Sequence, residues 1–466
     1  MGLLLTNIGL LASPVGSSAL KGCAQGEVLL IRDAVVGVEG GRIVFVGRGR
    51  EHGANDEPRS GGRIGGSSPA CLGSDELAPG YDILDCGGRL VTPGLVDSHT
   101  HLVFGGWRHS ELAQRLGGAS YLDILKSGGG ILRTVGHTRA ASEDELYDKG
   151  LGFLAEMLSL GVTTCEAKSG YGLSVDDELK QLRVIRMLSE GQPIDIVPTF
   201  MGAHAVPAEY SGNREGYIEL IIDEMLPTVA GGGLAEFCDI FCETAVFTPE
   251  ESRKILLEAA RHGFRLKAHV DEIDPIGGAE MAAEVGAVSA EHLIQASDAG
   301  IRAMAEKGVI AVLLPATSFY LDKPYARARD MVDAGVAVAV ATDFNPGSSP
   351  SLNMQFAMNL ACLKYRLTPA EALTAVTLNA AAAINRAESC GSIEVGKQAD
   401  LVIWEATDLE YIFYRYGSNL THMVVKNGKI VGNSELRIKN SELLSHHDPL
   451  EPAYHYTKTQ PSCPNH

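Results

Sequence analysis

The sequence of 466 residues is poor in basic side chains for its size. It has 39 lysines and arginines against 58 aspartates and glutamates, which gives a formal net charge of −19. Nucleic acids and anionic membranes bind basic surfaces, so this balance argues against both as partners. It does not exclude a small anionic substrate, because one or two arginines can bind a carboxylate inside an acidic protein.

The chain also lacks a long apolar run and a clear leader. Its first stretch, MGLLLTNIGLLASPVGSSA, has no basic residue before the apolar part, and no run reaches the roughly 18 apolar residues of a membrane-spanning helix. Gly2 and Thr6 match the loose pattern for N-myristoylation. A short strand accounts for the same residues more simply, and we expect one here.

Paired cysteines are missing as well. The nine cysteines are an odd number, form no CxxC pair and suggest no disulfide framework. A reducing compartment, the cytoplasm, is therefore expected.

The remaining pattern predicts an α/β protein with a barrel. From residue 88 to 387, eight short apolar segments alternate with longer helical ones, which predicts a closed (β/α)₈ barrel like that of triosephosphate isomerase. Short strands at 1–87 and 388–434, including a hairpin around EGGR, predict a small β-sandwich domain built from both chain ends. Residues 51–80 are expected to form a loop or insertion, and 435–466 a polar tail.

Two histidines follow each other closely in the segment VDSHTHLVF. If the strand continues through it, alternation places Asp97, His99 and His101 on one face, with the histidine Cα atoms roughly 6–7 Å apart, close enough to bind one ion. A single buried histidine usually just finds a hydrogen-bond partner. The pair at the end of a predicted barrel strand favours a metal site instead.

Other predicted strands also end in polar residues. KAHVDE ends with His269, SAEHL with His292, and AVATDFNPG with Asp343. Catalytic groups of such barrels lie at the carboxyl ends of the strands, where these side chains would converge. Nitrogen and oxygen ligands suit one divalent metal ion, Zn²⁺ or Fe²⁺.

These motifs give the chain its family resemblance. PGLVDSHTHLVFGG, SGGGILRTV, AKSGYGL, FMGAHAVP, DIFCE, AHVDE, AEHL, ATDFNPGS and the later GSIEVGKQADLVIW resemble the amidohydrolase superfamily. Within it, the chain is similar to the members that hydrolyse the ring amide of 4-imidazolone-5-propanoate to N-formimidoyl-L-glutamate in histidine degradation.

The resemblance implies a set of metal-site residues. His99, His101, His269 and Asp343 are the implied metal ligands. His292 is either a further ligand or a hydrogen-bond donor to the reacting carbonyl. No carboxylated lysine is expected, and Glu243 ranks below these residues as a bridging or supporting carboxylate.

The residue types also suggest a mechanism. A bound dication supplies hydroxide at neutral pH by lowering the pKa of its water to about 7. Glu272, three residues after His269, is placed to carry a proton to the departing ring nitrogen. We expect His292 to polarise the carbonyl and Asp343 to orient the water or accept its proton.

Substrate binding is assigned to the loops that follow the strands. By resemblance, Arg108, Tyr171 and His204 contact the substrate, with Arg108 and Tyr171 at its carboxylate. Glu272 also contacts it. Asn345, Gly347 and Ser348 are expected at the glutamate-like end of the product. The glycines at 128–130 are expected to form a mobile covering loop.

Two other functions remain open from the sequence. A nucleobase deaminase of the cytosine or guanine type uses the same metal-binding pattern, but a neutral base does not need Arg108 and Tyr171. A non-catalytic scaffold with this fold should have lost metal ligands, and this chain retains them.

The segment GSIEVGK is not a phosphate-binding loop, because Gln398 replaces the required Ser or Thr. A homodimer is the expected assembly.

Overall fold

A computed structural model of the chain describes residues 2–49, 80–118 and 129–431. The predicted insertion, except Gly80, and the predicted tail lie outside these residues. The same holds for Gly128 of the predicted covering loop, whereas Gly129 and Gly130 are described and buried. The seven described cysteines are all free thiols.

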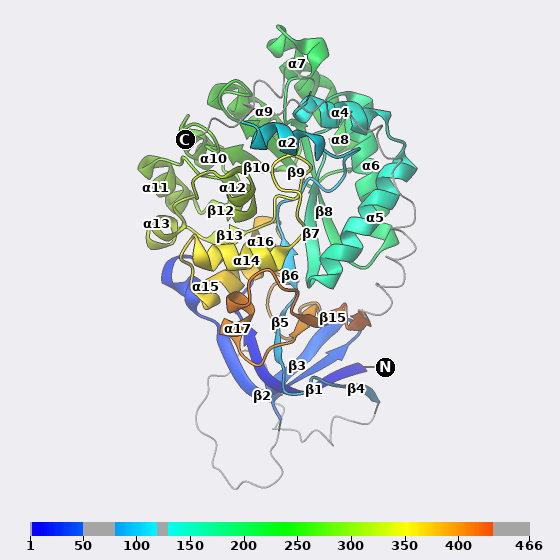
Figure 1. Cartoon of the computed structure of the whole chain (residues 1–466), viewed down its shortest axis with the longest axis vertical. Coiled ribbons are helices and arrows are strands. Elements are labelled where there is room, and N and C mark those ends of the chain that lie inside the picture. Colours follow the sequence, from blue (N-terminus) through cyan, green and yellow to red (C-terminus); the bar gives the residue numbers. More distant parts are fainter. Residues whose placement is uncertain (1, 50–79, 119–128, 432–466) are drawn as a thin grey trace, which may run out of the picture.

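The larger part of the chain forms the predicted barrel (Figure 1). Its eight strands are all parallel to their neighbours and follow each other around the barrel in chain order. They are β6 (Leu95–Asp97), β7 (Val162–Lys168), β8 (Asp195–Ala203), β9 (Phe237–Cys242), β10 (Arg265–Val270), β11 (Ser289–His292), β12 (Ile310–Leu313) and β13 (Val338–Val340). The eight-stranded α/β barrel is thus confirmed.

Hydrogen bonds just beyond the strands join the first strand to the last. The amide of Asp343 donates to the carbonyl of His99 at 3.1 Å, and the amide of His101 donates to the carbonyl of Phe344 at 2.9 Å. The hydroxyl of Thr342 donates to Asp97 at 2.6 Å. We call these contacts between β6 and β13 the barrel seam.

Helices surround the barrel and cover its strands (Figure 1). The α-helices are α2 (Ser110–Leu116), α4 (Ile131–Ala140), α5 (Glu143–Ser159), α6 (Val175–Gly191), α7 (Arg214–Leu220), α8 (Leu226–Gly231), α9 (Pro249–Arg261), α10 (Gly278–Glu284), α11 (Asp298–Lys307), α12 (Pro315–Leu321), α13 (Ala328–Asp333), α14 (Met354–Leu363), α15 (Pro369–Ala375), α16 (Leu378–Ala383) and α17 (Leu409–Tyr414). Shorter turns are η1 (Gly22–Gly26), η2 (Ala208–Tyr210) and η3 (Ile221–Met225).

Local sequence explains where several helices begin. Before α5, the Ser142 side chain accepts the backbone N–H of Glu145, whose carboxylate accepts the Ser142 N–H in return. Thr248 and Glu251 make the same reciprocal pair at α9. These caps satisfy amides that a helix start otherwise leaves without partners.

The two chain ends meet in a second sheet below the barrel, where the blue N-terminal strands and the orange C-terminal strand lie together in Figure 1. Its strands are β1 (Gly2–Ser13), β2 (Leu29–Glu39), β3 (Arg42–Arg48), β4 (Tyr81–Asp85), β5 (Leu90–Pro93), β14 (Leu401–Trp404), β15 (Thr421–Lys426) and β16 (Lys429–Val431). The order is β16-β15-β14-β5-β1-β2-β3, with β4 beside β1. Hydrogen bonding therefore makes this unit one mixed sheet.

Two local expectations need correction. We expected the barrel to begin at residue 88, but β5 pairs with β1 and β14, so the chain passes to the barrel only after Pro93. We also placed His99 and His101 within a strand. Strand β6 ends at Asp97, and the two histidines follow it. Beyond Asp97 the backbone pairs with the seam only through the single bridge between Thr100 and Phe344, and Thr100 keeps one backbone hydrogen bond to Lys168 of β7.

The barrel strands have two different faces. Outward side chains such as Cys165, Ala167 and Ala268 belong to the apolar core beneath the helices. The amino-terminal end of the barrel is filled by a separate apolar cluster that includes Val96 and Phe237. Above it the interior becomes polar, and this change positions the site.

Candidate metal centre and active site

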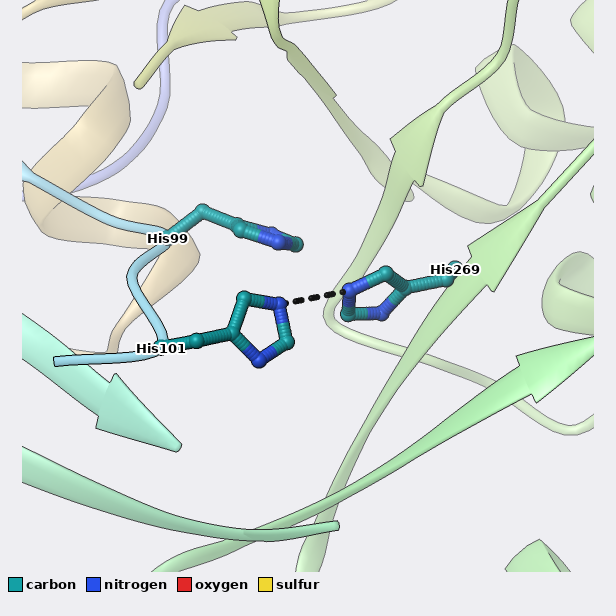
Figure 2. Close-up of side chains that lie close together, drawn as sticks. All are labelled: His99, His101 and His269. Carbon is teal, nitrogen blue, oxygen red and sulfur yellow. Dashed lines mark hydrogen bonds between the residues drawn. The ribbon is translucent and has the colours of Figure 1, made fainter. Parts of the chain in front are cut away.

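Buried histidines and one aspartate gather at the carboxyl ends of the barrel strands. Two overlapping groups have ligand atoms within 4.8 Å of one another: His99, His101 and His269, and His99, His292 and Asp343. Figure 2 shows the first group, with the rings of His99 and His101 turned toward His269 from the other side of the barrel. The structure thus brings together all five residues predicted to lie at the metal.

Two of these imidazoles are oriented from behind by carboxylates. Nδ1 of His99 lies 2.5 Å from Glu291, and Nδ1 of His269 lies 3.2 Å from Asp239. A carboxylate accepts hydrogen bonds, so Nδ1 carries the proton in both rings and Nε2 presents a lone pair.

The free nitrogens converge on one point. Nε2 of His99 lies 3.4 Å from the Asp343 carboxylate, and Nε2 of His101 lies 3.6 Å from the same oxygen. Nε2 of His269 is 3.3 Å from Nε2 of His101 (Figure 2). Nε2 of His99 is buried without a hydrogen-bond partner among the described residues. Inward-facing lone pairs of this kind suit a divalent cation, so the residues present fit the expected metal.

Burial keeps these histidines neutral, as metal ligands must be. It lowers the pKa of His99 and His101 well below the usual range, and that of His269 to about 3. It also lowers the pKa of His292. Burial raises the pKa of Asp343 to about 6, although His292 and the Thr317 hydroxyl at 2.6 Å counteract this.

Two of the site residues have a left-handed backbone. His292 has φ 68° and Asp343 has φ 54°. Such values are uncommon outside glycine and occur where the surrounding structure enforces them. Both residues stand where the chain leaves a strand, so the turn directs each side chain over the barrel end.

Glu272 lies beside this cluster. Its carboxylate is 3.8 Å from Nδ1 of His292. Burial, followed by the charge of Glu243, raises the pKa of Glu272 to about 7, which suits a proton carrier near neutral pH. Glu243 is not in either metal group: its oxygens accept the backbone amides of Thr244, Glu272, Ile273 and Asp274, so it fixes the loop that carries Glu272.

Arg108 stands on the loop after β6 and is already paired. Its Nε and Nη2 donate to Glu111 at 3.0 and 2.9 Å, and Glu111 is buried. Its Nη1 lies beside Gly347, where an added Cβ would come within 2.2 Å. The edge of the guanidinium away from Glu111 is therefore directed to the loop after Asp343.

Tyr171 and His204 surround His101. The His204 ring stacks on His101 with centroids 4.9 Å apart, and Tyr171 lies 5.2 Å from His204. Nδ1 of His204 is 3.0 Å from the Gly170 carbonyl, which leaves its Nε2 as an acceptor, and burial lowers its pKa to about 4. Gly170, at φ 111°, has no room for a Cβ beside His204.

Charges on either side act on Tyr171. Burial raises the pKa of Tyr171, Arg108 lowers it and Asp343 raises it, so the hydroxyl stays protonated near neutral pH. The Tyr171 ring lies 5.7 Å from the His101 ring, centroid to centroid, so Tyr171 stands beside the metal group.

The loop after Asp343 is held by its own asparagine. Asn345 donates to the Asp343 carbonyl at 2.7 Å and accepts the amides of Gly347 and Ser348 at 2.8 and 2.7 Å. It also donates to the Ser348 hydroxyl at 2.8 Å. Asn345 therefore shapes this loop, and a hydrogen bond from its side chain also lowers the pKa of the Asp343 carboxyl.

Sequence reasoning missed the residues behind the histidines. The side chains of Glu166, Lys168, Asp239, Lys267 and Glu291 are fully buried inside the barrel. A signal existed: ionisable residues at alternate positions of otherwise apolar strands, as in TTCEAK and RLKAHV, must face the barrel interior. It also missed Glu111, whose partner Arg108 is three residues away.

Known proteins resemble this chain over most of its length. Residues 90–431 match the amidohydrolase family. The imidazolonepropionase of Bacillus velezensis is 52% identical over 93% of this chain and 97% of its own length. That of Fusobacterium nucleatum is 54% identical over 76% of this chain and 86% of its own length.

Solved structures share the fold at much lower identity. A triazine hydrolase from Arthrobacter aurescens superposes with a TM-score of 0.69 at 18% identity, over 95% of this chain and 99% of that one. A zinc-bound adenosine deaminase from Xanthomonas campestris gives 0.63 at 18% identity, over 95% and 98%. The chain belongs to the amidohydrolase family, and within it to the group formed by the imidazolonepropionases.

Proposed function

We propose that the chain hydrolyses the ring amide C–N bond of 4-imidazolone-5-propanoate and releases N-formimidoyl-L-glutamate, a step of histidine degradation. Relatives of about half identity over nearly the whole chain support this activity. The observation that carries it is that Arg108, a cation for the propionate, lies against Gly347 on the loop that follows Asp343 of the metal group, while Tyr171 lies beside His101 of the same group.

One divalent metal ion, Zn²⁺ or Fe²⁺, would be held by His99, His101, His269 and Asp343. When bound, such an ion lowers the pKa of its water to about 7 and so supplies hydroxide at neutral pH. The buried, neutral imidazoles and the carboxylate support both metals. Zinc is present in structures of two proteins with this fold, an atrazine chlorohydrolase and the Xanthomonas deaminase.

The residues around the metal group divide the proton transfers. Glu272, with its raised pKa, takes a proton and passes it to the departing ring nitrogen. His292 donates a hydrogen bond to the ring carbonyl, where negative charge develops. Asp343 orients the attacking water.

The substrate's carboxylate would lie at the other end of the site. Arg108 binds it with the guanidinium edge that Glu111 leaves available, and the Tyr171 hydroxyl adds a hydrogen bond. His204 contacts the ring, and Asn345 arranges Gly347 and Ser348 so that they bind the glutamate-like end of the product.

The enzyme is proposed to act on this small molecule as a homodimer in the cytoplasm, without nucleic-acid or membrane partners. The acidic composition and the seven free thiols among the described residues support this setting. Within the described residues, no helix has the length and apolar character needed to cross a membrane.

The deciding experiment compares substrates on purified protein of known metal content. We expect turnover of 4-imidazolone-5-propanoate and none of cytosine or guanine. Turnover of a base without turnover of the imidazolone would replace the proposal with a deaminase. No turnover of any of the three by metal-loaded, folded protein would favour a scaffold.

A further inference from the structure

A network of charged side chains, which we call the charged network, fills the barrel interior directly beneath the metal group. Its members are Glu166 and Lys168 on β7, Asp239 on β9, Lys267 on β10 and Glu291 on β11, and each side chain is fully buried. Barrel interiors at this depth are normally filled by branched aliphatic side chains. Five buried charges in one place therefore call for a physical reason.

The two outermost carboxylates of this charged network contact metal ligands. Glu291 lies 2.5 Å from Nδ1 of His99, and Asp239 lies 3.2 Å from Nδ1 of His269. These are the only nitrogens of the two rings that do not face the metal group. A carboxylate at this place fixes both the ring orientation and the tautomer of a metal-binding histidine.

Three residues of the charged network connect these two carboxylates. Lys267 lies 3.1 Å from Glu291 and 3.5 Å from Glu166. Lys168 lies 2.7 Å from Glu166 and 2.7 Å from Asp239. The signs alternate from Glu291 through Lys267, Glu166 and Lys168 to Asp239, so each buried charge has an oppositely charged neighbour.

Such a charged network adds little to the stability of the fold by itself. Desolvating charges offsets most of their attraction, and well-packed apolar side chains of similar volume often stabilise a fold as well or better. Further hydrogen bonds, from Thr199 to Glu166 at 2.6 Å and from Ser289 to Glu291 at 2.5 Å, leave each carboxylate one direction in which to point. What the charged network provides is a fixed position for two carboxylates.

We propose that Lys168, Glu166 and Lys267 are positioning residues for the metal: they hold Asp239 and Glu291 against His99 and His269, so that both Nε2 atoms are preset for one cation. Within the described residues, no side-chain hydrogen bond or ion pair joins these three to the histidines or the aspartate of the metal group. The inference rests on the proposed metal site, but not on the identity of the substrate.

The test measures metal affinity without using activity. Metal-stripped wild type and Lys267→Met are titrated with Zn²⁺ against a competing chelator, and the melting temperature of each is recorded. We expect Lys267→Met to bind Zn²⁺ about 10- to 100-fold more weakly, the range typical for loss of such outer contacts.

Lys426→Met is the matched control. Lys426 is also a buried lysine between two carboxylates, 2.7 Å from both Asp195 and Asp400, but it lies on β15 of the terminal sheet. We expect it to lower the melting temperature and to leave Zn²⁺ affinity within about twofold of wild type. Equal loss of Zn²⁺ affinity in both variants, or wild-type affinity in Lys267→Met, would overturn the proposal.

A double variant covers the case in which Lys267→Met does not fold. Lys267→Met with Glu291→Gln removes both charges, and the glutamine oxygen can still accept the His99 N–H. We expect this protein to fold and to bind Zn²⁺ more weakly than wild type, and wild-type affinity would again refute the proposal. If wild type binds Zn²⁺ but does not open the imidazolone ring, the proposed function fails while this inference stands.

Discussion

Replacement of Arg108 by methionine separates substrate binding from metal binding. Methionine keeps most of the side-chain length and removes the guanidinium. Because Nε and Nη2 already donate to Glu111, the substrate carboxylate can take about two hydrogen bonds from the remaining N–H groups. A hydrogen bond to a charged group contributes about 1.5–3 kcal/mol, so the pair contributes at least about 3 kcal/mol. At 1.4 kcal/mol for each factor of ten, KM should rise at least about 100-fold.

The assay is steady-state hydrolysis of 4-imidazolone-5-propanoate, with the bound metal measured on the same preparations. We expect KM to rise much more than kcat falls, with metal content unchanged. Arg261→Met removes an exposed arginine that pairs with Glu258 on α9, and it should change neither constant.

A loss of stability must be told apart from a loss of binding. Removal of the guanidinium takes two hydrogen bonds from the buried Glu111 carboxylate, whose Oε1 still accepts the Gly130 amide at 2.9 Å. Glu111→Gln added to Arg108→Met should restore the melting temperature and leave KM high. A fall in bound metal that parallels the rise in KM would refute our division of roles, and an unchanged KM would show that the carboxylate binds elsewhere.

Three further predictions test other parts of the site. Glu272→Gln should lower kcat by about 10²- to 10⁴-fold with metal content intact. Because both the shuttle and the metal-bound water must be deprotonated, the wild-type kcat/KM should fall steeply as pH drops below about 7, and the variant should keep only the shallower fall that the water alone produces. Gly347→Ala should push the Arg108 guanidinium aside, since the new Cβ would lie 2.2 Å from Nη1, and raise KM about tenfold with kcat nearly unchanged in the same kinetic assay. Chelation of the metal should abolish activity and lower the melting temperature, and added Zn²⁺ or Fe²⁺ should restore both; full activity of a metal-free preparation would contradict the metal site.

The parts of the fold that the sequence predicts best are those that local pattern determines. Eight apolar segments separated by helical spacers predict eight parallel strands, and polar residues at their carboxyl ends must then meet. This reasoning brings His99, His269 and Asp343 together, although the last two lie far from the first along the chain. The run LVTPGLV misled the strand assignment, because it is mostly apolar while its two halves pair with different sheets.

Other features depend on three-dimensional partners that a sequence pattern does not specify. Asn345 follows a metal-binding motif, but its amide is used within its own loop. Glu243 ends a strand as the metal residues do, yet four backbone amides occupy its carboxylate. A side chain can make only a few hydrogen bonds, and only the structure shows which partners take them.

The barrel seam has a consequence for the order in which the protein folds and takes up its metal. His99 and Asp343 are joined through the backbone at the place where the first strand meets the last. During synthesis, His99 leaves the ribosome long before Asp343, so the ligand set is incomplete until nearly the whole barrel has been made. Contacts of such high sequence separation form late and slowly. Metal uptake should therefore follow barrel closure, and a bound ion should resist opening of the seam, since the ligands we propose for it lie on both edges.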